Sequence, residues 1–247
     1  FIYTIHSSRL ETYLTENNWI AKQILKKTTK IVVVSNFIKV KIESKFGPSS
    51  IEVISNSISK PTFLNKEKLD FEYIISVGRL VPLKQFDKLI ESYSQSNLPK
   101  KNIHLLILGV GDEQAKLEQK IANLKLESVV HLVGFKQNVL DYILNAKFLV
   151  LSSQYEGFPM TILEALSVGT PVVSFDCESG PNEMIHPNHN GILVENQNFT
   201  ELTHKMNIFV EDEILYQNCK NNAITSVAKF QSEVIVNQWL HVLNYGN

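Results

Sequence analysis

The sequence predicts an α/β protein built around a doubly wound, largely parallel sheet. Two observations support this fold class: short apolar runs of four to six residues recur along the chain, and longer amphipathic stretches separate them. Continuous rather than alternating apolar runs are typical of strands that are covered on both faces. The predicted strands are residues 31–35, 51–55, 73–78, 104–109, 129–134, 148–153, 171–175 and 191–195.

The amphipathic stretches supply the predicted helices, and a break in the pattern divides the chain. Helices are expected at residues 86–96, 113–124, 139–145, 161–168, 199–209 and 233–245. Residues 57–72 carry Pro, Asn and charge just before a fresh strand, which indicates an interdomain linker. The chain opens on Phe1, in a strand-like run, rather than on Met. We therefore expect a piece of a longer protein, with residues 1–56 ending a preceding α/β unit.

The composition is that of a globular protein and excludes several other classes. Of the 247 residues, 44% are hydrophobic and 20% are charged, which rules out disorder and collagen-like repeats. The two cysteines, Cys177 and Cys219, are isolated, so we expect a reducing, cytoplasmic location and no structural zinc. No apolar run approaches the roughly 18 residues that a membrane-spanning helix needs, and the first residues lack a secretion signal.

The charges are distributed unevenly although they nearly balance. Residues 22–45 hold seven Lys against one Glu, and residues 176–217 hold eight acids against one Lys. Two interpretations stay open: both stretches are solvated faces, or the Lys-rich stretch attracts an anionic ligand or the anionic leaflet of a membrane. A nucleic-acid partner is not expected at this charge balance.

Glycine-rich loops follow two predicted strands at the edge where parallel sheets bind ligands. The first places Gly78 and Arg79 at a strand end and Lys84 just before a helix, a combination suited to a diphosphate. The alternative is that both cations lie on the surface. The second, GVGDEQ at 109–114, lacks the third glycine of a dinucleotide-binding loop. It predicts a tight turn in which Asp112 caps the next helix.

A third loop carries two carboxylates eight residues apart. Glu156 lies in the loop that leaves a predicted strand, and Glu164 lies on the following helix. Eight helical steps rise about 12 Å, so the pair is too far apart for joint acid–base chemistry and is suited to holding two parts of an extended ligand. An ionised Glu accepts from the hydroxyls of a sugar or ribose, and the N–H groups of Gly157 and Phe158 face the same cleft. The alternative is that Thr161 and Glu164 form a helix capping box.

The motifs together resemble a known enzyme family. EGFPMTILE matches the E-x7-E signature of retaining GT-B glycosyltransferases of family 4. TIHSS, VVVSNFIK, VISNSIS, SVGRLVPLKQFDKLI, LLILGVGDE, VVHLVGF and GILVE follow in that family's order. The resemblance implies a two-lobed GT-B enzyme: a truncated N-terminal, acceptor-side lobe (1–60), a complete Rossmann-like nucleotide-sugar domain (61–230), and a C-terminal helix (231–247) that packs back on the first lobe.

The resemblance also implies roles for individual residues. Arg79 and Lys84 resemble the cations that bind the donor diphosphate and stabilise it as a leaving group. Glu164 resembles the residue that holds the ribose hydroxyls, and Glu156 the one beside the transferred sugar. His6 resembles the N-terminal-lobe histidine that faces that sugar, although a lone His near a strand is also a common core residue. The remaining donor-binding positions are Gly78, Gly134, Phe135, Gly157, Phe158, Pro159, Met160 and Thr161.

Three departures from the family pattern are visible. Ser57 replaces a turn glycine, which costs little if its φ is negative, and Gln85 replaces a glycine and makes the phosphate loop less permissive. The incomplete N-terminal lobe matters more, because an open cleft neither excludes water nor fixes an acceptor.

Residues 175–185 resemble a subgroup of bacterial capsule, lipopolysaccharide and glycan-assembly transferases. On that pattern Ser179–Pro181 would turn near the donor with Glu183 beside the pocket; the alternative is a polar loop in which Asn182 caps a helix. His186 and His189 lie in a predicted surface loop, and the sequence has no DxD triplet. We therefore expect no metal site and no cofactor.

The resemblance therefore implies a retaining glycosyltransferase. It would move a hexose or N-acetylhexosamine from a nucleotide sugar, with UDP as the expected nucleotide, to a glycan or lipid-linked acceptor in bacterial surface polysaccharide biosynthesis. We expect it in the cytoplasm, with peripheral contact to the inner face of the membrane. The alternative is a sugar-nucleotide-binding module without transferase activity; a GT-B epimerase is a third option that would need different acids around the sugar.

Overall fold

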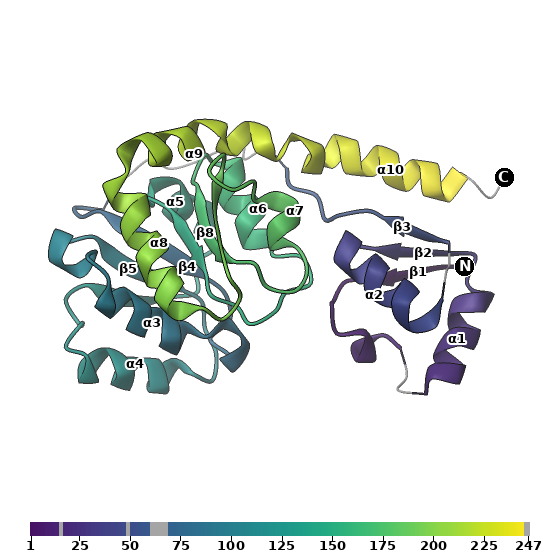
Figure 1. The fold of residues 1–247 in the computed structure, drawn as a ribbon, viewed down its shortest axis with the longest axis horizontal. Coiled ribbons are helices and arrows are strands. Elements are labelled where there is room, and N and C mark those ends of the chain that lie inside the picture. Colours follow the sequence, from purple (N-terminus) through teal and green to yellow (C-terminus); the bar gives the residue numbers. More distant parts are fainter. Residues whose placement is uncertain (15–16, 48–49, 60–68, 245–247) are drawn as a thin grey trace.

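The computed structural model describes residues 1–14, 17–47, 50–59 and 69–244. These residues form two lobes, and each contains its own parallel sheet (Figure 1). The α/β class that the apolar runs predicted is therefore confirmed. Residues 60–68, which make up most of the predicted linker, lie outside the described part of the chain.

The N-terminal lobe is a three-stranded sheet with two helices on one face. The strands are β1 (Ile2–Ile5), β2 (Lys30–Val33) and β3 (Ile51–Val53), in the order β1-β2-β3. Helix α1 (Asn18–Lys27) connects β1 to β2, and α2 (Asn36–Phe46) connects β2 to β3. A short 3-10 turn, Leu10–Thr12, precedes α1.

Neither helix of this lobe was among the predicted ones, although local signals for both exist. Ser35 caps α2 by accepting from the N–H of Ile38, and Gly47 ends it with a φ of 90°. The side chains of Ile38, Ile42 and Phe46, four residues apart, are buried. The run FIKVKIE alternates apolar and polar residues, which favours a strand, and tertiary packing decides for the helix.

The C-terminal lobe is a six-stranded parallel sheet in the order β6-β5-β4-β7-β8-β9. Its strands are β4 (Tyr73–Val77), β5 (His104–Leu108), β6 (Val130–Gly134), β7 (Leu149–Leu151), β8 (Val172–Phe175) and β9 (Gly191–Val194). Each predicted strand of this lobe is present. Side chains of β4 alternate between two buried clusters, with Ile75 in one and Ile74 in the other, because helices cover both faces.

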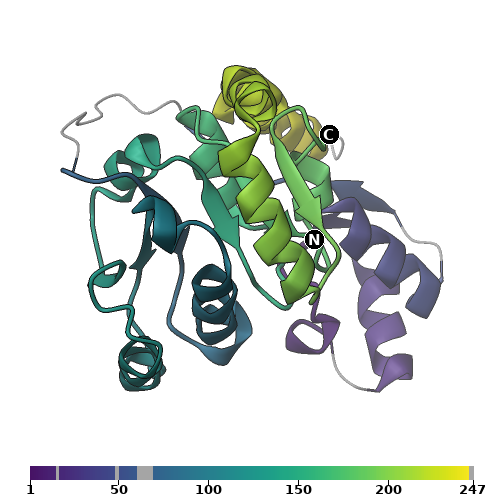
Figure 2. The same cartoon turned by 60° about the vertical axis from the view of Figure 1, so that its left-hand side comes forward.

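Helices α3 (Phe86–Gln95), α4 (Gln114–Asn123) and α8 (Phe199–Glu211) pack on one face of this sheet, and α5 (Val139–Asn145) and α6 (Met160–Ser167) pack on the other. The one-turn helix α7 (Pro181–Met184) follows β8, and short 3-10 turns occur at Pro82–Lys84, Pro99–Lys101 and Ala228–Phe230. Figure 2 shows the same arrangement from the side of this lobe.

Helices α9 (Glu213–Ser226) and α10 (Ser232–Asn244) follow one another across both lobes (Figure 1). Helix α9 was not predicted, because its sequence is rich in Asn and its buried residues, Tyr216, Cys219 and Ala223, are a sparse apolar stripe. Helix α10 reaches the N-terminal lobe, where Ile235 and Val242 pack on the sheet face opposite α1 and α2. Among the described residues no helix has the length and apolar character needed to cross a membrane.

Candidate functional site

The candidate site lies at the carboxyl edge of the six-stranded sheet, where β4 and β7 are neighbours. Ile75 of β4 pairs with Leu149 of β7, and from this pair the chain order runs outward in opposite directions. Such a reversal makes adjacent loops diverge and is where open parallel sheets bind ligands. The loop after β4 carries Arg79 and Lys84, and the loop after β7 carries Glu156. Strand order therefore brings two of the predicted loops together.

Lys84 and Glu156 form an ion pair at this edge. The Lys84 Nζ lies 2.6 Å from the Glu156 Oε1, and the two side chains are 17% and 12% exposed. The Lys84 Cε lies 3.1 Å from the position of a Cβ added to Gly78, so the lysine stem runs directly over that glycine. The hydroxyl of Ser152 donates to the Lys84 carbonyl at 2.8 Å. A largely buried ammonium is therefore fixed where two strands diverge.

Gln85, next to Lys84, does more than make the loop less permissive. Its backbone is left-handed, with φ 52° and ψ 38°, the region that glycine enters most easily. Its side chain is buried, and its amide Nε2 donates to the Oε1 of Gln197 at 2.9 Å. This contact ties the loop after β4 to the loop after β9. Ser57, the other departure, does not have a positive φ, so its replacement of glycine brings no backbone strain there.

The GVG sequence after β5 is needed for backbone packing. A Cβ on Gly109 would lie 1.8 Å from the Gly78 carbonyl oxygen, and one on Gly111 would lie 2.3 Å from that of Leu80. The N–H of Gly78 donates to the Leu108 carbonyl at 2.9 Å, so the two loops run in close contact. The predicted tight turn is correct. The predicted Asp112 cap is wrong, because α4 begins at Gln114 without a side-chain cap.

A cavity of about 310 Å³ opens beside this packing. Its wall includes Arg79 and Glu164 together with the exposed side chains of Phe135 and Val110. Burial raises the pKa of the Glu164 carboxyl above its ordinary value. In the described structure the Arg79 guanidinium has no hydrogen bond or ion pair with another side chain, and it is exposed. Cation, carboxyl and aromatic ring thus surround one small cavity.

The two groups of predicted residues meet at Gly78, which lines the cavity and underlies the Lys84 side chain. Arg79 and Glu164 lie on the cavity side, while Lys84 and Glu156 form the ion pair. Their placement along one edge agrees with an extended ligand. The roles of these residues in binding and catalysis stay predictions.

Helix α6 begins at Met160, so Thr161 and Glu164 are inside it rather than in a capping box. Pro159 is the N-cap residue and provides no side-chain acceptor. The capping-box alternative is therefore wrong, and both side chains instead line the cavity. A helix start without a side-chain cap leaves N–H groups and a partial positive charge at the site.

The other predicted donor-binding residues occupy several environments. Gly134 ends β6 with a φ of 76° and precedes Phe135. The side chain of Phe158 is buried against Phe230, with ring centroids 5.7 Å apart, so its backbone alone can face a ligand. His6 is exposed, so the core-histidine alternative is wrong.

The loop at Gly157 joins the two lobes. A Cβ on Gly157 would lie 2.2 Å from the His6 carbonyl oxygen, which explains why glycine is needed there. The Gly157 carbonyl accepts from the Ser179 hydroxyl at 2.5 Å, and the Ser35 and Ser179 hydroxyl oxygens are 2.6 Å apart. Ser35 is the α2 cap. The end of β1, the start of α2 and residues 156–158, here called the EGF loop, thus lie in contact with one another.

Residues 178–183, which were predicted to lie near the donor, make contacts with the N-terminal lobe. Glu183 lies 3.5 Å from the N–H of Phe37 at the start of α2, and Glu178 pairs with Lys41 at 3.2 Å. Asn182 does not cap α7. Sequence reasoning missed these interlobe pairs; the signal that was available is the surplus of lysines in 22–45 opposite the surplus of acids in 176–217.

Cys177 is buried near the ion pair and is not a suitable nucleophile. Burial, followed by the nearby Glu156 carboxylate, raises the pKa of its thiol to about 12. Within the described ranges no group of three or more His, Cys, Asp or Glu side chains is arranged to hold a metal ion. Independence from a metal stays a prediction.

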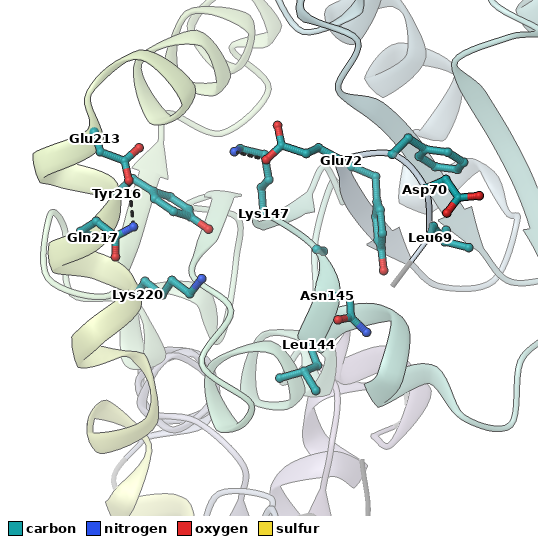
Figure 3. Close-up of a pocket in the computed structure, with 13 residues that line it drawn as sticks. Leu69, Asp70, Glu72, Leu144, Asn145, Lys147, Glu213, Tyr216, Gln217 and Lys220 are labelled. Carbon is teal, nitrogen blue, oxygen red and sulfur yellow. Dashed lines mark hydrogen bonds and ion pairs between the residues drawn. The ribbon is translucent and has the colours of Figure 1, made fainter. Parts of the chain in front are cut away.

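A larger cavity, of about 550 Å³, lies at the opposite, amino edge of the same sheet (Figure 3). Lys147 there pairs with Glu72 at 3.0 Å, and Lys147 and Lys220 both lie 5.7 Å from the Tyr216 ring centre. None of the predicted site residues lines it. We take the smaller cavity as the candidate site, because that one lies at the switch point beside the largely buried ion pair.

Comparison with known proteins gives matches over most of the chain. A glycosyltransferase of amylovoran biosynthesis from Erwinia amylovora is 29% identical over 225 residues, which are 87% of this chain and 62% of the relative. A Campylobacter jejuni enzyme, N-acetylgalactosamine-N,N'-diacetylbacillosaminyl-diphospho-undecaprenol 4-alpha-N-acetylgalactosaminyltransferase, is 31% identical over 201 residues, which are 80% of this chain and 54% of the relative.

A solved structure and a family model agree with these relatives. TarM from S. aureus, in a complex with UDP and alpha-GlcNAc-glycerol, has a TM-score of 0.86 and 26% identity, covering 98% of this chain and 50% of TarM. This chain therefore spans about half to three fifths of the length of the proteins it matches. The model described as "Glycosyl transferases group 1" matches residues 59–226, well over half of the chain. The chain belongs to the glycosyl transferases group 1 family.

Proposed function

We propose that this chain carries the donor-binding half of a retaining glycosyltransferase. It would take a hexose or N-acetylhexosamine from a UDP-sugar and pass it to a glycan or lipid-linked acceptor in bacterial surface polysaccharide biosynthesis, at the cytoplasmic face of the membrane. The observation that carries this proposal is the meeting of Arg79, Lys84, Glu156 and Glu164 along one edge of the sheet, at its switch point. The UDP complex of TarM supports the choice of nucleotide.

The geometry suggests how the donor would lie. Phe135 offers an exposed ring for the base, and Glu164 lies in the same cavity to accept hydrogen bonds from the ribose hydroxyls. The diphosphate would then extend past Arg79 towards Lys84. Of the three N–H donors of Lys84, one is directed to Glu156, so others are available to a phosphate oxygen.

The chemistry would be electrostatic assistance to the leaving group. As the bond from the anomeric carbon to the diphosphate oxygen breaks, negative charge grows on the diphosphate, and Arg79, Lys84 and the start of α6 would stabilise it. The acceptor hydroxyl would enter on the same face of the sugar, pass its proton to an oxygen of the departing diphosphate and form the new glycosidic bond. Glu156, held by Lys84, would orient the transferred sugar through its hydroxyls. His6, which is exposed, would face that sugar from the other lobe.

The test begins with nucleotide binding to this chain. Calorimetric titration with UDP and UDP-sugars should show saturable binding, and Arg79→Ala should weaken it at least tenfold, because a phosphate loses a charge-assisted partner. Lys100→Ala, an exposed lysine in the same lobe, is the matched control and should bind as the parent does. Absence of UDP binding by the parent chain, or equal binding by Arg79→Ala, would overturn the proposed donor site.

Transfer is tested separately with the full-length protein. Radiolabelled UDP-sugars and the anomeric signal of the product by NMR report turnover and stereochemistry; a product of inverted configuration would exclude the retaining reaction. A second candidate is a sugar-nucleotide-binding module without turnover. The observation that favours it is that this chain covers only 50–62% of the matched proteins. Binding without transfer would select it.

A further inference from the structure

The loop that follows β8 lies against the EGF loop and forms two hydrogen bonds with its backbone. The Glu156 N–H donates to the Glu178 carbonyl at 3.1 Å, and the Ser179 hydroxyl donates to the Gly157 carbonyl at 2.5 Å. Ser179 is only 2% exposed. Its φ of 67° lies in the left-handed region, where a serine is strained and a glycine is not. A buried and strained serine thus holds the loop that carries Glu156.

The protons of this contact have a single arrangement, because each hydroxyl has one proton to donate. The Gly157 carbonyl can only accept, so it takes the proton of Ser179. The Ser35 hydroxyl, 2.6 Å from that of Ser179, is then the donor between the two serines. Ser35 accepts in turn from the N–H of Ile38 at 3.3 Å. A continuous chain of hydrogen bonds therefore runs from the first turn of α2, through the two serines, to the EGF loop.

Further contacts hold the start of α2 against the C-terminal lobe. The Glu183 carboxylate lies 3.4 Å from the Asn36 amide nitrogen and 3.5 Å from the Phe37 backbone nitrogen, and Lys41 pairs with Glu178 at 3.2 Å. Figure 1 shows α2 on the side of its lobe that faces the six-stranded sheet. These charged groups are exposed, whereas both serines are buried. Solvent therefore weakens the ion pair, and the serine chain is the contact that is shielded from water.

The Gly157 carbonyl fixes the direction of the next N–H group. A peptide unit is planar and trans, so the Gly157 carbonyl and the Phe158 N–H point in opposite directions. The carbonyl points to Ser179, and the N–H therefore points away from the loop after β8. Because β7 lies between β8 and β4 in the sheet, that direction leads towards the β4 loop with Arg79 and Lys84. Among the described residues no backbone or side-chain acceptor takes a hydrogen bond from the Phe158 N–H.

We propose that Ser179, ordered by Ser35 of the other lobe, is a positioning residue that turns the Phe158 N–H towards an oxygen of the donor's second phosphate or sugar. This inference rests on the proposed function. Phe158 follows Glu156 by two residues, so its N–H belongs with the end of the donor that UMP lacks. The left-handed φ supports a role for the hydroxyl, because glycine would relieve the strain but could not hold the peptide. Contact between the lobes and orientation of the donor loop thereby depend on one another.

The experiment measures how much affinity the chain gains from the end of the donor beyond UMP. Calorimetric titrations use UMP, UDP, UDP-glucose and UDP-N-acetylglucosamine. Ser179→Ala and Ser179→Gly should each lower the gain over UMP about tenfold, because the N–H loses its fixed direction, and UMP should bind as it does to the parent. Only the Gly variant also relieves the backbone strain, so equal losses assign the effect to the hydroxyl. A loss already seen with UDP identifies the second phosphate as the acceptor, and a loss with the UDP-sugars alone identifies the sugar.

A second variant and a matched control test the path through the two serines. Ser35→Ala should lower the gain severalfold, and combining it with Ser179→Ala should lower it no further than Ser179→Ala alone, since Ser35 acts through Ser179. Ser96→Ala is the control: its buried hydroxyl donates to the Tyr93 carbonyl at 2.6 Å and accepts from the Leu98 N–H at 3.3 Å, all within the C-terminal lobe. This variant should keep the parent's affinity for all four ligands.

Several outcomes would overturn the inference: equal losses for UMP and the longer ligands, a full gain in both Ser179 variants, a loss in the Ala variant that the Gly variant does not share, or losses from the two serines that add. A parent chain that gains nothing over UMP would overturn it as well. Absence of UDP binding by the parent would overturn the proposed function and this inference with it, whereas normal binding by the parent with unaffected Ser179 variants overturns this inference alone.

Discussion

The two edges of the six-stranded sheet each carry a cavity and a lysine–glutamate ion pair, but the surroundings of these pairs differ. At the amino edge the cavity is larger, about 550 Å³ against 310 Å³, and Glu72, the partner of Lys147, is 65% exposed. At the carboxyl edge Lys84 and Glu156 are 17% and 12% exposed. Removal from water strengthens the electrostatic interaction of Lys84 with Glu156, whereas solvent screens that of Lys147 with Glu72.

Polar groups at the amino edge also form hydrogen bonds with one another. The rings of His104 and His131 are joined by a 2.9 Å contact between ring nitrogens, and Phe71 stacks on His104 with ring centres 4.0 Å apart. The Tyr73 hydroxyl donates to the Tyr142 carbonyl. At the carboxyl edge, by contrast, Arg79 extends beside an exposed aromatic ring. The difference favours the carboxyl edge as the candidate site, because convergent, partly desolvated charges lie there at a switch point, although its cavity is the smaller one.

The largest effect is expected at the glycine that packs the carboxyl-edge loops. Gly109→Ala places a Cβ 1.8 Å from the Gly78 carbonyl oxygen at a φ of 145°, so the loops must separate and we expect a loss of about 3 kcal/mol or more. Gly134→Ala is the matched control: its φ is 76°, but nothing lies within 4 Å, so about 1 kcal/mol is expected. Urea unfolding measures both; equal losses would show that close loop packing is unimportant.

The next largest effect is expected when the lysine of the carboxyl-edge ion pair is removed, and a much smaller one when the lysine of the amino-edge pair is removed. Lys84→Ala leaves the Glu156 carboxylate largely buried without its partner, which should cost about 2–3 kcal/mol of unfolding free energy and reduce UDP affinity about a hundredfold. Lys147→Ala at the amino edge leaves a Glu72 that solvent already reaches, so less than about 1 kcal/mol and no change in UDP binding are expected. Similar effects of the two variants on UDP titrations would remove the distinction between the edges.

Glu164→Gln should act on stability and binding with opposite signs. Because burial raises the pKa of the Glu164 carboxyl, its ionisation opposes folding: stability is highest below the ordinary Glu pKa and is lost as pH rises through the folded-state value. The Gln variant should therefore unfold at a higher temperature than the parent at pH 7, with the difference vanishing in acid. Its UDP affinity at pH 7 should fall about tenfold, because a ribose acceptor is lost. Higher stability with unchanged affinity would place Glu164 outside the donor site.

The smallest effect is expected at Gln85. Gln85→Gly relieves left-handed strain of about 1 kcal/mol and loses hydrogen bonds with Gln197 of similar value, so unfolding free energy should change by less than about 1 kcal/mol. Gln85→Ala keeps the strain and loses the bonds, and should be less stable than the Gly variant by about 1 kcal/mol. An Ala variant as stable as the Gly variant would contradict this account of the loop.

Much of the fold and part of the site could be predicted from sequence. Continuous apolar runs located the strands, since a strand buried on both faces needs no alternation. Membership of the glycosyl transferases group 1 family was also predicted correctly, because its motifs combine glycines, cations and carboxylates in a fixed order. Family 4 and retention of configuration stay predictions. Helices α1, α2 and α9 were missed, because the α2 sequence resembles a strand and the apolar stripe of α9 is sparse.

Contacts between loops could not be predicted from the sequence, for a different reason. The Lys84–Glu156 pair joins residues 72 positions apart, and the Ser35–Ser179 contact joins residues 144 apart. Neither follows from local spacing, because the first depends on which strands become neighbours and the second on how the two lobes meet. The Thr161–Glu164 capping box, which local spacing did suggest, is absent because the N-cap of α6 is Pro159, two residues before Thr161.

The sequence by itself determined the strands of both sheets, the chemical groups at the strand ends and the glycines where backbones approach. The tertiary structure alone decided that β4 and β7 are adjacent, so that Lys84 meets Glu156, and that the EGF loop lies against the end of β1. The physical reason is that strand identity follows from local apolar burial, whereas strand order and lobe contact follow from packing of the whole chain.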